Sequence, residues 1–307
     1  MVWVVKVTRS ARRGQGKWSA LLFAIVFLVD PGMPRAGSQS YSEGLLWRVS
    51  RPGIADSFVL GTIHIADPRI TISQSINDAL AQSRTLATEL PSAALTAEEW
   101  AELEELDHAQ QLDMLLQPGT FAEVCSQLSA QGIPATVVAR LKPWAAMIKL
   151  SRTRGGAEPP PLDVQILSSA KIRRMRVESI ESTEEQASSF DSIPLDSQVA
   201  LLTHVLADRD ALAAGVEVTV RAWLRKDLET LAQFATRAEQ RFPGMGIHYE
   251  QLAKYVVRSR TSVMHHRLFM PLRAGRVFVA IGAMHLYGID GMLRMLEDDG
   301  YRIQRMW

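Results

Sequence analysis

Apolar and polar positions follow two patterns along this 307-residue chain, one typical of strands and one typical of helices. Short runs that are apolar throughout, or that alternate with polar residues, predict strands at residues 44–49, 57–60, 85–90, 176–180 and 277–281. Stretches with an apolar residue every three or four positions predict helices at residues 70–84, most of 96–150, 162–170, 182–190, most of 194–268 and 289–298. The pattern therefore predicts a helix-rich α/β protein whose strands lie mostly near the two ends of the chain.

Turn and capping residues mark some boundaries between these elements. Arg51-Pro-Gly53 separates the first two predicted strands, which predicts a β-hairpin. Thr120 is followed by Glu123, and Ser182 is followed by Glu185, at the spacing of a capping box. We therefore expect helices to begin at both positions.

Residues 1–38 have the layout of a secretory signal. Five basic residues lie between positions 6 and 17, ten apolar residues follow at 20–29, and small or turn-forming residues lead to Ala36-Gly-Ser38. The apolar run is shorter than the roughly 20 residues that a transmembrane helix needs. We therefore expect an exported protein, periplasmic or extracellular, with cleavage near residues 36–39 and a folded domain over 41–307. The alternative is an uncleaved N-terminal segment that anchors the domain to the membrane.

Charge and cysteine content narrow the choice of partners. A signal that ends at Ser38 contains six of the 34 Lys and Arg residues and one of the 33 Asp and Glu residues, so the rest of the chain has a net charge of −4. A mildly acidic domain without a basic stripe argues against nucleic acid as a partner. Cys125 is the single cysteine, so no internal disulfide can form, and its apolar neighbours Val124 and Leu128 predict a core position.

Two passages carry the strongest indication of chemistry. Gly61-Thr-Ile-His64 and Gly282-Ala-Met-His285 each follow an apolar run, and each has a His three residues after a Gly. A Gly at a strand end lets the backbone turn or approach a neighbour closely. Each His then lies at the carboxyl end of a strand, where open α/β sheets bind their ligands. If the two strands are neighbours, both imidazoles converge on one site.

Glu89 completes a candidate set of metal ligands. It stands among apolar residues in the strand predicted at 85–90, and an inward carboxylate needs a partner because burying a lone charge is costly. Two neutral imidazoles and a carboxylate bind a divalent transition metal such as Zn²⁺, Mn²⁺ or Co²⁺ and leave a position open for water. Such an ion lowers the pKa of bound water and polarises a carbonyl, which indicates a hydrolase. Alternatively, Glu89 is the base that accepts the proton of the water.

The order of these motifs resembles that of the TraB/PrgY/GumN family, which includes the animal TIKI proteins. The two Gly-x-x-His motifs, the strand with Glu89, and Gly288 and Gly291 carry this resemblance, which extends over residues 41–307. Lesser matches follow in order at Lys142-Pro-Trp144, Leu162-Asp163, Glu181, Glu185-Gln186, Trp223, Arg260 and Gly300-Tyr301. The resemblance implies a fold of the erythromycin-esterase/ChaN type, in which two related α/β halves enclose a cleft.

The resemblance also implies a function. It suggests a secreted or membrane-associated, metal-dependent protease that acts on a peptide or protein, as attributed to the TIKI members. In that family the two motif histidines and the acidic residue form the site, which corresponds here to His64, His285 and Glu89. Two alternatives keep the fold. One is a metal-free hydrolase of esters or lactones with a His as general base, and the other is a non-catalytic protein that binds haem, metal or a peptide.

Arg260 is the candidate substrate-binding residue, because a guanidinium can bind a substrate carboxylate or an oxyanion. An ion-paired or surface arginine is the alternative interpretation. The sequence departs from the family pattern nearby, since Thr261 follows Arg260 where the family often has Asn. Asp290 stands where the family typically has Glu, and Pro161 replaces a Gly. We expect these departures to affect contacts with the substrate more than the metal site.

Overall fold

A computed structural model of the protein describes residues 41–89, 97–107, 109–151, 159–207 and 209–307. The signal predicted at residues 1–38 lies outside the described residues. Within these ranges the chain is a helix-rich α/β protein, as the hydrophobic pattern predicted, and its six strands form one mixed sheet. No helix in the described ranges is both long enough and apolar enough to cross a membrane.

The sheet brings together strands from distant parts of the chain. Its order is β4-β3-β5-β2-β1-β6. The strands are β1 (Leu46–Arg51), β2 (Ile54–Thr62), β3 (Thr85–Thr88), β4 (Arg176–Ser179), β5 (Val277–Gly282) and β6 (Arg302–Arg305). Strands β4, β3, β5 and β2 are parallel, whereas β1 runs antiparallel to both β2 and β6. The predicted hairpin between β1 and β2 is confirmed, with Gly53 at a φ of +79° in its turn.

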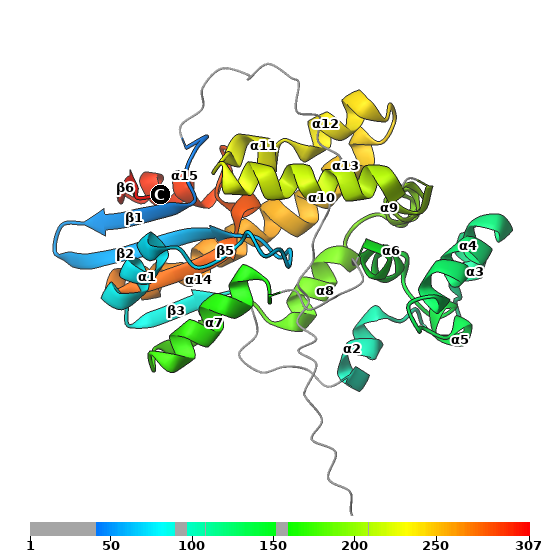
Figure 1. Cartoon of the computed structure of the whole chain (residues 1–307), viewed down its shortest axis with the longest axis horizontal. Helices are drawn as coiled ribbons and strands as arrows, with labels where there is room; N and C mark the ends of the chain where they lie inside the picture. Colours follow the sequence, from blue (N-terminus) through cyan, green and yellow to red (C-terminus); the bar gives the residue numbers. More distant parts are fainter. Residues whose placement is uncertain (1–40, 90–96, 108, 152–158, 208) are drawn as a thin grey trace, which may run out of the picture.

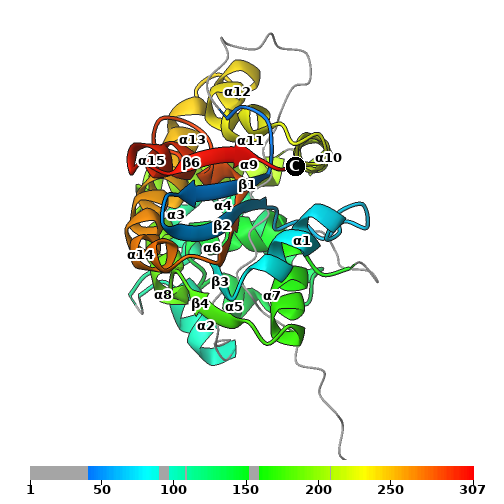
Figure 2. The ribbon, with the colours of Figure 1, turned by 90° about the vertical axis from the view of Figure 1, so that its left-hand side faces the viewer.

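Helices cover both faces of this sheet. Helices α1 (Gln74–Gln82) and α7 (Leu162–Ile172) lie on one face, and α14 (Arg260–Ala274) and α15 (Met292–Asp298) lie on the other (Figures 1 and 2). The other helices are α2 (Ala97–Glu104), α3 (Leu112–Leu115), α4 (Pro118–Ser129), α5 (Ala135–Val138), α6 (Pro143–Ser151), α8 (Thr183–Asp191), α9 (Leu195–Ala207), α10 (Arg209–Leu224), α11 (Leu228–Ala232), α12 (Phe234–Arg241) and α13 (Gly246–Leu252). A π-helical turn, η1 (Ala253–Ser259), leads into α14, and a 3₁₀ turn, η2 (Ala283–His285), follows β5.

The parallel strands point toward the helical part of the molecule. In Figure 1 the arrow of β1 points away from helices α2–α6, so the antiparallel β2 and the strands parallel to it end facing them. The carboxyl rim of the sheet therefore faces the helical part of the molecule (Figure 1), and Glu89 and His285 at that rim are buried.

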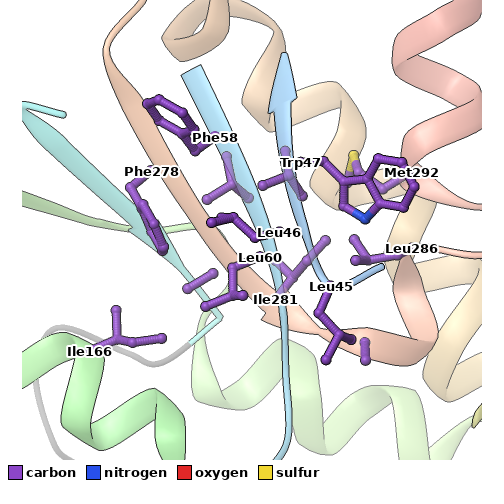
Figure 3. Close-up of a cluster of buried hydrophobic side chains, with 14 of the residues drawn as sticks. Leu45, Leu46, Trp47, Phe58, Leu60, Ile166, Phe278, Ile281, Leu286 and Met292 are labelled. Carbon is purple, nitrogen blue, oxygen red and sulfur yellow. The ribbon is translucent and has the colours of Figure 1, made fainter. Parts of the chain in front are cut away.

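Two hydrophobic clusters stabilise these parts. The first lies around the sheet and includes the fully buried Leu46, Leu60 and Phe278 (Figure 3). The second lies among α4, α6, α8, α9 and α13, where Trp144 stacks on Phe190 with ring centroids 5.2 Å apart. Met284, inside the second Gly-x-x-His motif, packs against both clusters. The second motif therefore lies where the two clusters meet.

Some local predictions hold and others fail for a physical reason. The capping box at Ser182 and Glu185 is present, with both reciprocal hydrogen bonds at the start of α8. The prediction at Thr120 is wrong, because α4 begins at Pro118. Proline is favoured in the first turn of a helix, where its missing N–H costs nothing. Cys125 is half-buried with a free thiol and packs against the helical cluster.

Candidate functional site

Three side chains from different strands lie together at the carboxyl rim of the sheet. His64 lies two residues after β2, Glu89 directly follows β3, and His285 closes η2 after β5. Since β5 lies between β3 and β2, these three strand ends are adjacent. The neighbour relation that the Gly-x-x-His repeat requires is therefore present, because β2 and β5 pair in parallel along their length.

Gly282 marks the place where these side chains meet. A Cβ atom at Gly282 would lie 3.4 Å from His64 Nε2, 3.5 Å from Glu89 Oε1 and 3.5 Å from His285 Cδ2. The N–H of Gly282 donates to Glu89 Oε1, and His285 Nε2 lies 3.9 Å from the same oxygen. We call the space in front of the Gly282 Cα the convergence point. Glycine leaves this space open where a larger residue would fill it.

A buried carboxylate orients His64. The Nδ1–H of His64 donates to Asp163 Oδ2 at 2.8 Å, and Asp163 lies in the first turn of α7 with 3% of its surface exposed. Burial acts to lower the pKa of His64, but the adjacent Asp163 carboxylate outweighs it and raises the pKa to about 9. The hydrogen bond fixes the ring with Nε2 directed toward the convergence point.

Thr261 orients His285 in a similar way. The Thr261 hydroxyl donates to the carbonyl of Val257 at 2.7 Å, so its oxygen accepts the proton of His285 Nδ1 at 2.8 Å. Nε2 of a neutral His285 then carries a lone pair and faces Glu89. Burial lowers the pKa of His285 to about 4, despite the opposing effect of the Glu89 carboxylate. His285 is therefore a neutral imidazole at pH 7.

Glu89 is a buried carboxylate held from several directions. Its Oε2 accepts from Arg260 Nη2 at 2.9 Å, and its backbone carbonyl accepts from Gln186 at 2.9 Å. Burial raises the pKa of Glu89. At the low pH where Glu89 titrates His285 is protonated, so the charges of His285, Arg260 and His64 outweigh burial and lower the pKa of Glu89 to about 2. Glu89 is therefore ionised and faces both imidazoles.

Arg260 links the site to a second buried acid. It lies at the junction of η1 and α14, and π-helical turns often occur at functional sites because they change the direction of side chains. Its Nε donates to Glu181 Oε1 at 3.0 Å, and its Nη1 donates to the carbonyl of Val256 at 3.2 Å. Burial raises the pKa of Glu181, which Arg260 opposes. The structure thus places Arg260 in an ion-pair network, and its role as a substrate anchor stays a prediction.

Sequence reasoning assigned no role to several residues of this site. Asp163 and Trp223 were visible only as members of short motifs, and Thr261 only as a departure from the family pattern. Trp223 donates to the carbonyl of Gly61 at 3.0 Å and so holds the first Gly-x-x-His turn. The signals in the sequence were a lone Asp at an apolar helix start and a Trp in a helix, and both are too common in ordinary helices to indicate a site.

The donor set suits a divalent transition metal, although the side chains are not already spaced for one. Among the described residues, no three His, Cys, Asp or Glu side chains form a group that could hold an ion as they stand. However, Asp163 and Thr261 hold the Nδ1 atoms, which leaves both Nε2 atoms for an ion, as in carboxylate–histidine–metal sites. The site also has a net charge of −2 when both imidazoles are neutral. This charge is the sum of three carboxylates, those of Glu89, Asp163 and Glu181, and one guanidinium, that of Arg260.

Two pockets lie beside the first residues of α14, Arg260 and Thr261. One has a volume of about 330 Å³ and is lined by Thr261, Met284 and Tyr287 among others. The other has a volume of about 440 Å³ and is lined by Arg260 and Glu181, by Ser188 and Ser189 of α8, and by Ser192, which directly follows α8. Each pocket therefore adjoins a residue that holds His285 or Glu89 in place.

Comparison with known proteins gives one family. The model of the TraB/PrgY/gumN family matches residues 45–305, which span all six strands and contain His64, Glu89 and His285. No curated protein and no solved structure matches the chain. Because the family model covers most of its length, the chain belongs to the TraB/PrgY/gumN family.

Proposed function

We propose that this protein is an exported, metal-dependent hydrolase that cleaves peptide bonds. The observation that carries the proposal is the convergence of His64 Nε2, Glu89 Oε1 and the His285 ring on the space in front of Gly282. Family membership and the position of the site at the carboxyl rim of the sheet both support it.

Each residue has a distinct part in this proposal. His64, Glu89 and His285 would hold a divalent ion such as Zn²⁺, Mn²⁺ or Co²⁺, which when bound supplies Lewis acidity and lowers the pKa of water. Asp163 and Thr261 hold the two imidazoles so that their Nε2 atoms face inward. Arg260 holds the Glu89 carboxylate, and its one remaining N–H, on Nη1, would bind the substrate's carboxylate or carbonyl oxygen.

The substrate class, the overall fold and the compartment belong to the same proposal. Pockets of about 330 and 440 Å³ beside the site are large enough for amino-acid side chains, which supports a peptide or protein substrate. We also propose the relation to the erythromycin-esterase/ChaN fold with its two related halves. Export through the N-terminal signal would deliver the enzyme to the periplasm or the extracellular space.

The decisive experiment compares metal content and hydrolysis in matched variants. The full chain is expressed, purified, analysed for bound Zn, Mn and Co, and assayed with a fluorogenic peptide library. We expect His64→Ala, Glu89→Gln and His285→Ala each to lose activity and metal while keeping a cooperative unfolding transition. His265→Ala is the matched control, since His265 lies on α14 and bonds Asp299 at 2.9 Å, away from the convergence point. Full activity in any of the three variants would reject the proposal.

A second candidate is a metal-free hydrolase of esters or lactones. In its favour, His64 bonds the Asp163 carboxylate whereas the buried His285 bonds the neutral Thr261 hydroxyl. Asp163 therefore raises the pKa of His64 to about 9, and burial lowers the pKa of His285 to about 4. Such a difference is typical of an acid–base pair. Activity that resists chelators but depends on His64 and His285 would select this candidate over the metal-dependent one.

A further inference from the structure

Thr62, the last residue of β2, carries a buried hydroxyl without a partner. The residue is 2% exposed, and its Oγ1 has no hydrogen bond within the part of the chain that the structure describes. Buried hydroxyls are nearly always hydrogen-bonded, because leaving one unpaired destabilises the folded state. An orphan of this kind indicates that a water or a ligand atom binds there.

The sheet register shows on which face of the sheet the Thr62 side chain lies. Thr62 pairs with Gly282 across the parallel β2–β5 ladder, and residues paired in this way project to the same face of a sheet. The Cβ direction of Gly282 leads to the convergence point. The preceding residue, Gly61, projects to the opposite face, where a Cβ would meet Leu286 and Ala283. Since neighbouring strands are about 4.8 Å apart, the Thr62 side chain begins roughly 5 Å from the convergence point.

We propose that Thr62 is a positioning residue that holds the water consumed in hydrolysis. Its hydroxyl can donate one hydrogen bond and accept others, so it can fix the position and the orientation of a water beside the two histidines. This inference rests on the proposed hydrolase function and adds to it the residue that binds the second reactant. Nothing in the set of His64, Glu89 and His285 requires a hydroxyl at this position, so the proposal can fail while that set stands.

The test uses two variants of the full chain, one that keeps the shape of the side chain and one that keeps its hydroxyl. Thr62→Val removes the hydroxyl and keeps the shape, whereas Thr62→Ser keeps the hydroxyl. Thr219→Val is the control, because Thr219 is also buried but bonds the carbonyl of Gly215 within α10. Crystal structures of the wild type and of Thr62→Val are compared for a water within hydrogen-bond distance of residue 62, and kcat, KM and the melting temperature are measured on one peptide substrate.

We expect the wild type to hold a water at Thr62 Oγ1 and Thr62→Val to lose it. The melting temperature of Thr62→Val should stay close to that of the wild type, because the lost hydroxyl bonds no other group of the described chain. We expect its kcat to fall about tenfold, the rate equivalent of one ordinary hydrogen bond, with KM unchanged. Thr62→Ser should restore most of kcat, and Thr219→Val should match the wild type.

Three results would overturn the inference. The first is a wild-type crystal structure without a water or ligand atom at Oγ1. The second is a water that is lost in Thr62→Val while kcat stays at the wild-type value, since that water is then structural. The third is a wild type without hydrolytic activity or bound metal, which rejects the proposed function itself. The second result leaves the proposed function intact, so the two failures can be told apart.

Discussion

Gly282→Ala is a direct test of the convergence point. The backbone at Gly282 has φ −54° and ψ 136°, a conformation that alanine adopts without strain. The added methyl would lie 3.4 Å from His64 Nε2 and 3.5 Å from both Glu89 Oε1 and His285 Cδ2, which are ordinary contact distances. A Gly→Ala change in a compatible conformation stabilises a protein by about 0.4–1 kcal/mol through the unfolded chain. We therefore expect the metal-free variant to be as stable as the wild type, or slightly more stable.

The same methyl occupies the space that an ion or its water would need. Zn²⁺ binds His nitrogen and carboxylate oxygen at about 2.0–2.2 Å, so the three donors have to close around the convergence point. With the methyl there, we expect metal affinity to fall at least about 100-fold, or roughly 2.7 kcal/mol. Peptide hydrolysis should fall to background, while the unfolding transition stays cooperative.

The assay combines isothermal titration with Zn²⁺, Mn²⁺ and Co²⁺, metal analysis of the purified protein, and thermal unfolding without metal. Gly61→Ala is the informative counterpart, because its Cβ would lie 2.8 Å from Leu286 Cδ1 and 3.0 Å from the Ala283 Cα. Overpacking of this kind costs about 1–3 kcal/mol, so this variant should lose stability and displace η2. Wild-type metal affinity and activity in Gly282→Ala would refute the idea that the three side chains act at one point.

Two further predictions concern groups around the site. Asp163→Asn removes the carboxylate that orients His64, so metal affinity and activity should fall about 10- to 100-fold; unchanged affinity in a metal titration would contradict this. The pKa of Glu185 is about 2, because Arg267 and the Ser182 N–H stabilise its charged form. These contacts therefore stabilise the folded state fully at a pH above 4.5, the usual pKa of Glu, and this contribution is lost as the pH falls through 2. Arg267→Ala should raise that pKa toward 4.5 in an NMR titration of the side-chain carboxyl, and an unchanged value would show that the capping bond alone lowers it.

The sequence was informative wherever a pattern was local or repeated. Most strands and helices followed from hydrophobic periodicity, and β2 and β5 pair, as a site shared by the two Gly-x-x-His motifs requires. The capping box at Ser182 was predicted, but the one at Thr120 was not formed because Pro118 starts that helix earlier. A local signal therefore succeeds until a stronger local signal overrides it.

The partners of the site residues could not be predicted, because they are set by the packing of distant elements. Asp163 lies 99 positions from His64, and Arg260 lies 171 positions from Glu89, so no spacing rule connects them. The sequence also suggested that the two motif glycines have the same purpose. The structure separates them: Gly61 allows close packing against η2, whereas Gly282 keeps the space between the three site residues open.

This arrangement links the formation of the site to completion of the fold. His64 is oriented by α7, Glu89 by the η1–α14 junction and by α8, and His285 by α14. Each of these elements packs on the sheet or on a neighbouring helix, so we expect the Nε2 atoms to face inward only once these contacts have formed. An orientation that is fixed before any ion or substrate binds lowers the ordering cost of binding, which is what a preorganised site requires. Substitutions that loosen α7 or η1 should therefore weaken metal binding even where the strands that carry His64, Glu89 and His285 remain intact.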